Sequence, residues 1–147
     1  MRVGAEQARQ FLEQHHKELD SHIAVAGDLT PAQVHALYDS TRCVVLPSRY
    51  EGFGLPLVEA LQRGKQVLCS DIPAFREQLV MYDALDSAEL IPSGDAVCLA
   101  DAMEQILKKP FAPRNDLVEI SRHVARWTWV DVARRCYDHL CSISTRG

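Results

Sequence analysis

The sequence predicts an α/β domain with a mainly parallel sheet flanked by helices. Short apolar runs alternate along the chain with stretches of helical periodicity, which is the order of elements in βαβ units. The apolar runs do not alternate with polar residues, as expected for parallel strands that are covered on both faces. The 147 residues have the size of one domain, so residues 1–147 are assigned to a single domain.

Composition excludes several classes of protein. With 47% hydrophobic and 24% charged residues, the chain is neither disordered nor fibrous, and its net charge of −4 argues against a general nucleic-acid binder. The longest strongly apolar run, Cys43 to Leu46, is far shorter than the about 20 residues of a membrane-spanning helix. The N-terminal residues show no secretory signal. The five cysteines, odd in number and without a CxxC pair, indicate a reduced, cytoplasmic protein.

Local signals place the elements of the first third of the chain. Residues 5–19 carry apolar side chains at helical spacing, and the apolar run 23–26 predicts a short buried strand. A helix then begins at residue 30, because Thr30 can cap it and Gln33 can complete a capping box.

The remaining elements continue the alternation of strand and helix. They are, in order, a strand at 43–46, a helix from about 56 to 64, a strand at 67–69, a helix at 73–80, a strand at 89–91, a helix that opens at Asp95, and helices at about 116–126 and 129–142. Gly64 is suited to the C-terminal end of its helix. Thr128, with Asp131 three residues on, is suited to cap the last helix.

Residues 46–60 form a strand, a glycine-bearing loop and a helix N-terminus, and this segment carries the chemistry. In an open parallel sheet, ligands bind beyond the carboxyl ends of the strands, where this loop begins. Gly52 and Gly54 let the backbone approach a ligand, and N–H groups at a helix start can hold a phosphate. The other interpretation is a tight turn in which the glycines serve geometry and Glu59 only favours the helix dipole. The physics of the segment leaves both open.

Two carboxylates, Glu51 and Glu59, flank this predicted anion site. A carboxylate beside a phosphate is costly unless it accepts hydrogen bonds from neutral donors or stabilises positive charge. Sugar hydroxyls are suitable donors, and each hydrogen bond to a charged acceptor contributes roughly 1.5–3 kcal/mol. The pattern therefore indicates a ligand that combines phosphates with hydroxyl-rich rings, namely a nucleotide-sugar.

The same segment resembles a known signature. Ser48-x-x-Glu51-Gly52-Phe53-Gly54-Leu55-Pro56-x-x-Glu59-Ala60 resembles the double-glutamate motif of retaining glycosyltransferases of family 4, which have the GT-B fold. The resemblance extends over about residues 23–140. It implies that the chain is the C-terminal, Rossmann-like part of a GT-B glycosyltransferase, the part that binds the nucleotide-sugar donor.

The resemblance also implies roles for individual residues. Glu51 is expected to be catalytic, contacting the donor sugar and stabilising its developing positive charge. The donor-binding residues are Gly52, Phe53, Gly54, Leu55 and Glu59, with Glu59 on the ribose hydroxyls and the backbone of the others on the diphosphate and sugar. Residues 70–77 are expected to form a neighbouring wall. The implied transfer retains configuration, needs no metal or cofactor, and has a glycan or lipid-linked acceptor. The full-length enzyme is expected in the cytoplasm, peripheral to the cytoplasmic membrane.

The chain departs from the family at its beginning. It lacks the acceptor-binding domain and the first two strands of the donor domain, which carry an Arg and Lys pair. We therefore expect the chain alone to be inactive, and a non-catalytic nucleotide-sugar-binding or assembly module remains the alternative. The missing strands leave an edge at 43–46 that either the strand 23–26 covers within one chain or a second chain covers in a homodimer. We favour the homodimer.

Other signals carry less weight. The six histidines show no metal-ligand spacing, so we expect no metal site. Trp127 and Trp129 are expected to anchor the terminal helix in the core rather than to form a ligand platform. The basic face near the C-terminus is interpreted as solvated rather than lipid-binding; it comprises Arg122, Arg126, Arg134 and Arg135.

Overall fold

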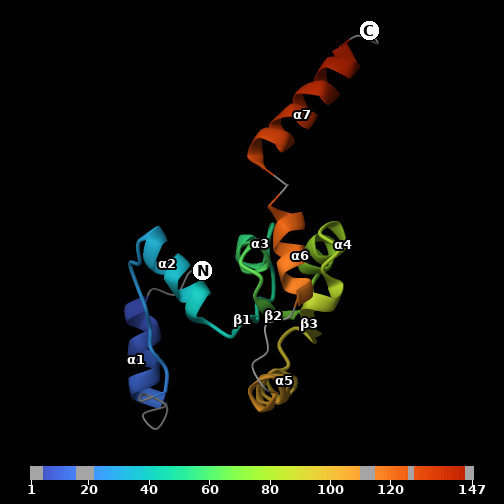
Figure 1. Ribbon diagram of the computed structural model, residues 1–147. Helices are drawn as coiled ribbons and strands as arrows, with labels where there is room; N and C mark the ends of the chain where they lie inside the picture. Colours follow the sequence, from blue (N-terminus) through green and yellow to red (C-terminus); the bar gives the residue numbers. More distant parts are fainter. Residues whose placement is uncertain (1–4, 16–21, 110–114, 126–127, 145–147) are drawn as a thin grey trace. The chain divides into compact units, whose positions relative to one another are not determined.

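The computed structural model describes residues 5–15, 22–109, 115–125 and 128–144 (Figure 1). The chain divides into two compact units, residues 1–37 and residues 38–147, and each is considered by itself.

The first unit is helical. It contains α1 (Ala5–His15) and most of α2 (Pro31–Ser40). The capping box predicted at the start of α2 is confirmed, because Gln33 Oε1 accepts from the Thr30 N–H at 2.9 Å and the Gln33 N–H donates to Thr30 Oγ1 at 3.4 Å. The helix predicted over 5–19 is present as far as His15, and residues 16–19 lie outside the described residues.

The prediction of a strand at residues 23–26 is wrong. These residues adopt no regular secondary structure, and Ile23 is 42% exposed. A strand exists only where a neighbouring strand takes up its N–H and C=O groups, and apolar character alone does not supply one. Two of the four residues are alanines, so the run also has little apolar surface to bury.

The second unit is built on a parallel sheet of three strands, in the order β1-β2-β3 among the described residues. The strands are β1 (Cys43–Leu46), β2 (Gln66–Ser70) and β3 (Ala88–Ile91), and Val45, Leu68 and Glu89 are aligned across them. All three strands were predicted, with ends within a residue or so of those observed. The predicted fold class, a mainly parallel sheet flanked by helices, is confirmed.

Helices cover both faces of this sheet (Figure 1). The helices of the second unit are, in chain order, α3 (Leu55–Gln62), α4 (Pro73–Met81), the short 3₁₀ helix η2 (Leu85–Ser87), α5 (Ala96–Lys108), α6 (Asn115–Val124) and α7 (Trp129–Ser144). Helices α3, α4 and α6 lie on one face and α5 lies on the other.

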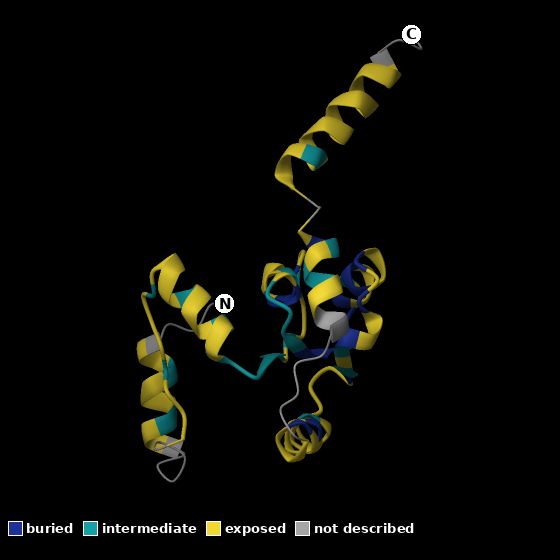
Figure 2. Cartoon of the chain, in the orientation of Figure 1, coloured by how far each residue is buried: buried dark blue, intermediate teal, exposed yellow. Residues whose placement is uncertain are grey.

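Alternate residues of β2 supply the two apolar clusters, as the period of a strand requires. Val67 and Cys69 point to the cluster formed with α3, α4 and α6, and Leu68 points to the cluster formed with α5. Figure 2 shows the buried residues concentrated in this sheet and the helices against it.

The strand β1 is less covered than predicted. All four of its residues are only half-buried, and among the described residues β1 pairs with β2 alone. Of the two outcomes predicted for this edge, pairing with residues 23–26 within the chain is not observed among the described residues. Pairing with a second chain stays a prediction.

The capping predictions at the C-terminal helices are confirmed. Asp95 is the N-cap of α5, and its Oδ1 accepts hydrogen bonds from the N–H groups of Val97 and Cys98 at 3.1 and 2.9 Å. At the start of α7, Asp131 Oδ2 accepts from Thr128 Oγ1 at 2.6 Å, and these hydrogen bonds lower the pKa of the Asp131 carboxyl.

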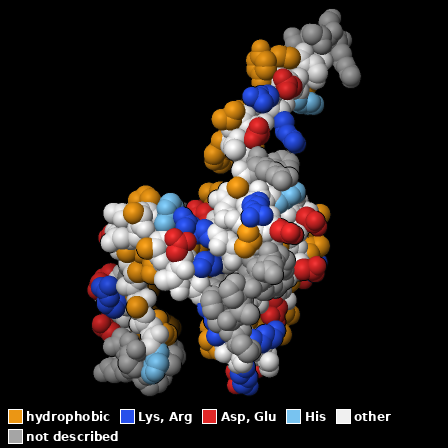
Figure 3. All heavy atoms as spheres, in the orientation of Figure 1, with side chains coloured by type: hydrophobic (Ala, Val, Ile, Leu, Met, Phe, Trp, Pro, Cys, Tyr) orange, Lys and Arg blue, Asp and Glu red, His pale blue; other side chains and the backbone are white. Residues whose placement is uncertain are grey.

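The helix α7 is exposed along its described length. Trp129 is 76% exposed, so the prediction that it anchors the helix in the core is wrong; Trp127 lies outside the described residues. Figure 3 shows hydrophobic side chains interspersed with charged ones along this helix. No helix among the described residues is both long enough and apolar enough to cross a membrane.

Candidate functional site

The predicted site lies on the loop that leaves the carboxyl end of β1 and enters α3. Gly54 is the residue before α3 and has φ 82° and ψ 48°, in the left-handed region that glycine favours. A Cβ at this position would lie 2.7 Å from Cε1 of Phe75 on α4. Gly54 is therefore required both by its backbone angles and by the close approach of α4.

The other predicted glycine has no such constraint. A Cβ on Gly52 would meet no atom within 4 Å, so this position faces open space. The loop between the two glycines is fastened by Gln78 of α4, whose Nε2 donates to the carbonyl oxygen of Phe53. The Gln78 side chain is buried, so this hydrogen bond is shielded from water.

No side chain caps the N-terminus of α3, and none caps that of α4, whereas side-chain oxygens cap the starts of α2, α5 and α7. The first turn also contains Pro56, which has no N–H group. A helix start carries the equivalent of roughly +0.5 charge. The N-terminus of α3 is thus suited to hold an anionic group of a ligand.

The two glutamates of the motif lie on either side of this helix start, and each accepts a hydrogen bond from a hydroxyl group. Glu51 is half-buried on the loop, and its Oε1 accepts from Ser48 Oγ at 2.8 Å. Glu59 is exposed on α3, and its Oε2 accepts from the hydroxyl of Tyr38, on α2, at 3.0 Å. Among the described residues, no hydrogen bond reaches the second oxygen of either carboxylate.

Tyr38 has an unusual environment for a tyrosine. Partial burial raises its pKa to about 12, and the hydrogen bond to Glu59 contributes to the increase. The Tyr38 hydroxyl therefore stays protonated and remains a hydrogen-bond donor at physiological pH.

This pKa predicts a loss of stability at alkaline pH. The folded chain holds the Tyr38 proton with a pKa of about 12, against an ordinary value of 10.0, so the associated stabilisation is complete below pH 10 and is lost as the pH rises to about 12. We expect the free energy of unfolding in urea to fall less over this range in Tyr38→Phe than in the wild type. Equal falls in the two proteins would contradict the assignment.

The predicted wall at residues 70–77 does border the loop, through α4. Phe75 contacts the Gly54 position and, like Ser70, is almost fully buried. On the same wall Arg76 is exposed and forms an ion pair with Asp71, which lowers the pKa of the Asp71 carboxyl.

Three side chains that are not among the predicted site residues also belong to this region. Tyr38 donates a hydrogen bond to Glu59, and Gln78 donates one to the loop. The guanidinium of Arg49 lies 3.7 Å from the position that a Cβ on Gly94 would occupy. Because Gly94 follows β3, Arg49 reaches from the loop after β1 toward the loop after β3, along the carboxyl edge of the sheet. The sequence signal that could have identified Gln78 is its helical spacing from Phe75, on the face that also carries Leu79.

A separate pocket of about 310 Å³ lies between the turn after α4 and helix α6. None of the predicted site residues lines it. Its lining residues are Tyr82, Asp83, Asp86, Ser87, Glu119, Ile120 and His123. In the described parts of the chain, no three His, Cys, Asp or Glu side chains are grouped so that they could hold a metal ion.

Three comparisons place the chain among known proteins. Phosphatidyl-myo-inositol mannosyltransferase of Mycobacterium leprae (strain TN) is 31% identical over 130 residues, which cover 88% of this chain and 34% of that protein. Serotype-specific mannosyltransferase WbdA of Escherichia coli is 36% identical over 63 residues, which cover 43% of this chain and 8% of that protein. Sucrose-phosphate synthase from Thermosynechococcus elongatus shares the fold, with a TM-score of 0.78 at 24% identity over 99% of this chain and 36% of that one.

The chain thus spans about a third of the length of its M. leprae relative. The family described as "Glycosyl transferases group 1" matches residues 3–124, which include every predicted site residue. Since this match extends over most of the sequence, the chain belongs to the group 1 glycosyltransferases.

Proposed function

We propose that the chain is the donor-binding part of a retaining GT-B glycosyltransferase of family 4 and that it binds a nucleotide-sugar. The observation that carries this proposal is an uncapped helix N-terminus flanked by two carboxylates at the carboxyl edge of a parallel sheet. The helix start suits a diphosphate, and the carboxylates suit hydroxyl groups on either side of it.

Each part of the donor has a partner in this arrangement. The backbone of Gly52, Phe53, Gly54 and Leu55 holds the diphosphate and the sugar, and Gly54 lets α3 start close to them. Glu59 accepts hydrogen bonds from the ribose hydroxyls. Glu51 contacts the donor sugar and stabilises the positive charge that develops as the bond to the leaving diphosphate breaks.

The names of the relatives indicate which classes of donor and acceptor to test first. Both relatives are named mannosyltransferases, so we propose a hexosyl donor, with a mannosyl nucleotide as the first to test. The M. leprae protein is named for a phosphatidyl-inositol acceptor, which supports a glycan or lipid-linked acceptor here. We propose that transfer needs no metal or cofactor, since the helix start supplies the positive charge for the diphosphate. A cytoplasmic location stays a prediction.

Glu59→Gln tests the nucleotide site. The wild-type chain is titrated with GDP, UDP and ADP by ligand-detected NMR, and the nucleotide that binds most tightly is used for the variants. Losing a charged acceptor is expected to weaken its binding by roughly 1–3 kcal/mol, since hydrogen bonds to charged groups lie in this range. The fold should not change, because Glu59 is exposed.

Glu104→Gln is the matched control. Glu104 is an exposed glutamate on α5, across the sheet, where it pairs with Lys108 at 2.8 Å. Such surface pairs contribute little, so this variant should bind as the wild type does. Equal affinity of the wild type and Glu59→Gln would refute the ribose role.

A further inference from the structure

Glu59 receives its hydrogen bond from a residue outside the signature. Tyr38 lies 21 residues earlier, in the last turns of α2, and its hydroxyl donates to Glu59 Oε2 at 3.0 Å. We infer that Tyr38 is a positioning residue, whose hydroxyl holds the Glu59 carboxylate so that its other oxygen is presented to the ribose of the nucleotide. This inference rests on the proposed function.

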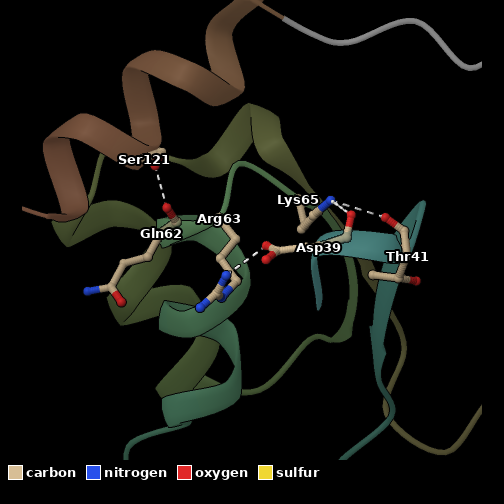
Figure 4. Close-up of polar contacts among 6 residues, drawn as sticks. All are labelled: Asp39, Thr41, Gln62, Arg63, Lys65 and Ser121. Carbon is tan, nitrogen blue, oxygen red and sulfur yellow. Dashed lines mark hydrogen bonds and ion pairs between the residues drawn. The ribbon is translucent and has the colours of Figure 1, made fainter. Parts of the chain in front are cut away.

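Tyr38 is itself held in place. It is partly buried against the apolar cluster under α3 and α4. The chain next to it is tied to the end of α3, because Arg63 Nη1 pairs with Asp39 Oδ1 at 2.7 Å (Figure 4). Lys65 Nζ donates to the carbonyl oxygens of Asp39 and Thr41 at 2.9 and 3.3 Å. The Tyr38 hydroxyl is therefore delivered from a fixed point.

Glu59, by contrast, is an exposed side chain that would otherwise sample many rotamers. Ordering it at the moment of binding would reduce affinity, and a hydrogen bond that orders it beforehand removes this loss. The high pKa of Tyr38 keeps the donor proton on the hydroxyl. Oε2 is engaged by Tyr38, and Oε1 is left for the ligand.

Tyr38 could instead serve only to pack the core, and Tyr38→Phe separates the two roles because phenylalanine keeps the ring. Binding is measured in the wild type, Tyr38→Phe, Glu59→Gln and the double variant. Each is titrated with the nucleoside diphosphate selected above and with its 2′,3′-dideoxy analogue. Tyr50→Phe is the control, since Tyr50 is 85% exposed on the neighbouring loop.

We expect Tyr38→Phe to weaken binding of the ribonucleotide about 2- to 10-fold, the loss expected when one further side chain has to be ordered on binding. It should have no further effect when Glu59→Gln is already present, and none on the dideoxy analogue, which offers Glu59 no hydroxyl. Tyr50→Phe should bind as the wild type does.

Two results would overturn the inference while leaving the proposed function intact. One is a Tyr38→Phe variant that binds the nucleotide as tightly as the wild type does, while Glu59→Gln binds it more weakly. The other is an equal loss for ribonucleotide and dideoxy analogue, which would show that Tyr38 only supports the fold. A wild-type chain that binds no nucleoside diphosphate would instead overturn the proposed function, and this inference with it.

Discussion

Gly54→Ala is expected to destabilise the second unit by about 2–5 kcal/mol. A left-handed conformation costs a residue with a side chain about 1–2 kcal/mol, and overpacking a core costs about 1–3 kcal/mol more. Both apply, because Gly54 has φ +82° and its added Cβ would lie 2.7 Å from Cε1 of Phe75. Urea denaturation followed by circular dichroism measures the change.

Substitutions at two other glycines separate the conformational cost from the cost of overpacking. Gly94 has φ +83° but only ordinary contacts at 3.7 Å, so Gly94→Ala should show the conformational cost of about 1–2 kcal/mol alone. Gly52 has neither constraint, and Gly52→Ala should change stability by less than about 0.5 kcal/mol, as surface substitutions do. Similar stability changes for Gly52→Ala and Gly54→Ala would contradict the role assigned to the close approach of α4.

A polypeptide of these 147 residues is expected to transfer no sugar at an enzymatic rate and to bind the donor weakly at best. Orienting the two reactants supplies roughly 7–11 kcal/mol of catalysis, and the motif described here addresses only the donor. The M. leprae relative is about three times as long, which leaves room for an acceptor site. Release of nucleoside diphosphate from mannosyl nucleotides, with lipid and glycan acceptors, is the measurement.

That mannosyltransferase, assayed under the same conditions, is the positive control for the assay. Turnover by the 147-residue polypeptide at about 1 s⁻¹ or faster, within the ordinary range of enzymes, would show the prediction wrong. Donor binding without turnover would support a donor-binding part that works only beside an acceptor site.

Features with local causes could be predicted from the sequence. The capping box of Thr30 and Gln33 and the cap at Asp95 each depend on a few neighbouring residues, and the structure shows both of them. The strand at 43–46 was also predictable, because its apolar run is flanked by turn residues on both sides.

Features that depend on distant partners could not be predicted. The run 23–26 has the apolar character of a strand but pairs with no strand among the described residues. Trp129 has the character of a core residue but is exposed to solvent. The contact between Tyr38 and Glu59 joins residues 21 positions apart on two helices. A single sequence shows neither the distance nor the direction of such contacts.

The carboxylates of the site and the apolar core are made of different residues. Glu51, Glu59 and Ser48 belong to neither apolar cluster, so exchanging them leaves the packing of the sheet untouched. An ancestral domain of this kind could therefore acquire a new donor through mutations in the loop without first gaining stability to compensate. Gly54 is the exception, because its left-handed backbone and the close approach of Phe75 make the fold depend on it, and drift at this position would be lost by selection even where the ligand has changed.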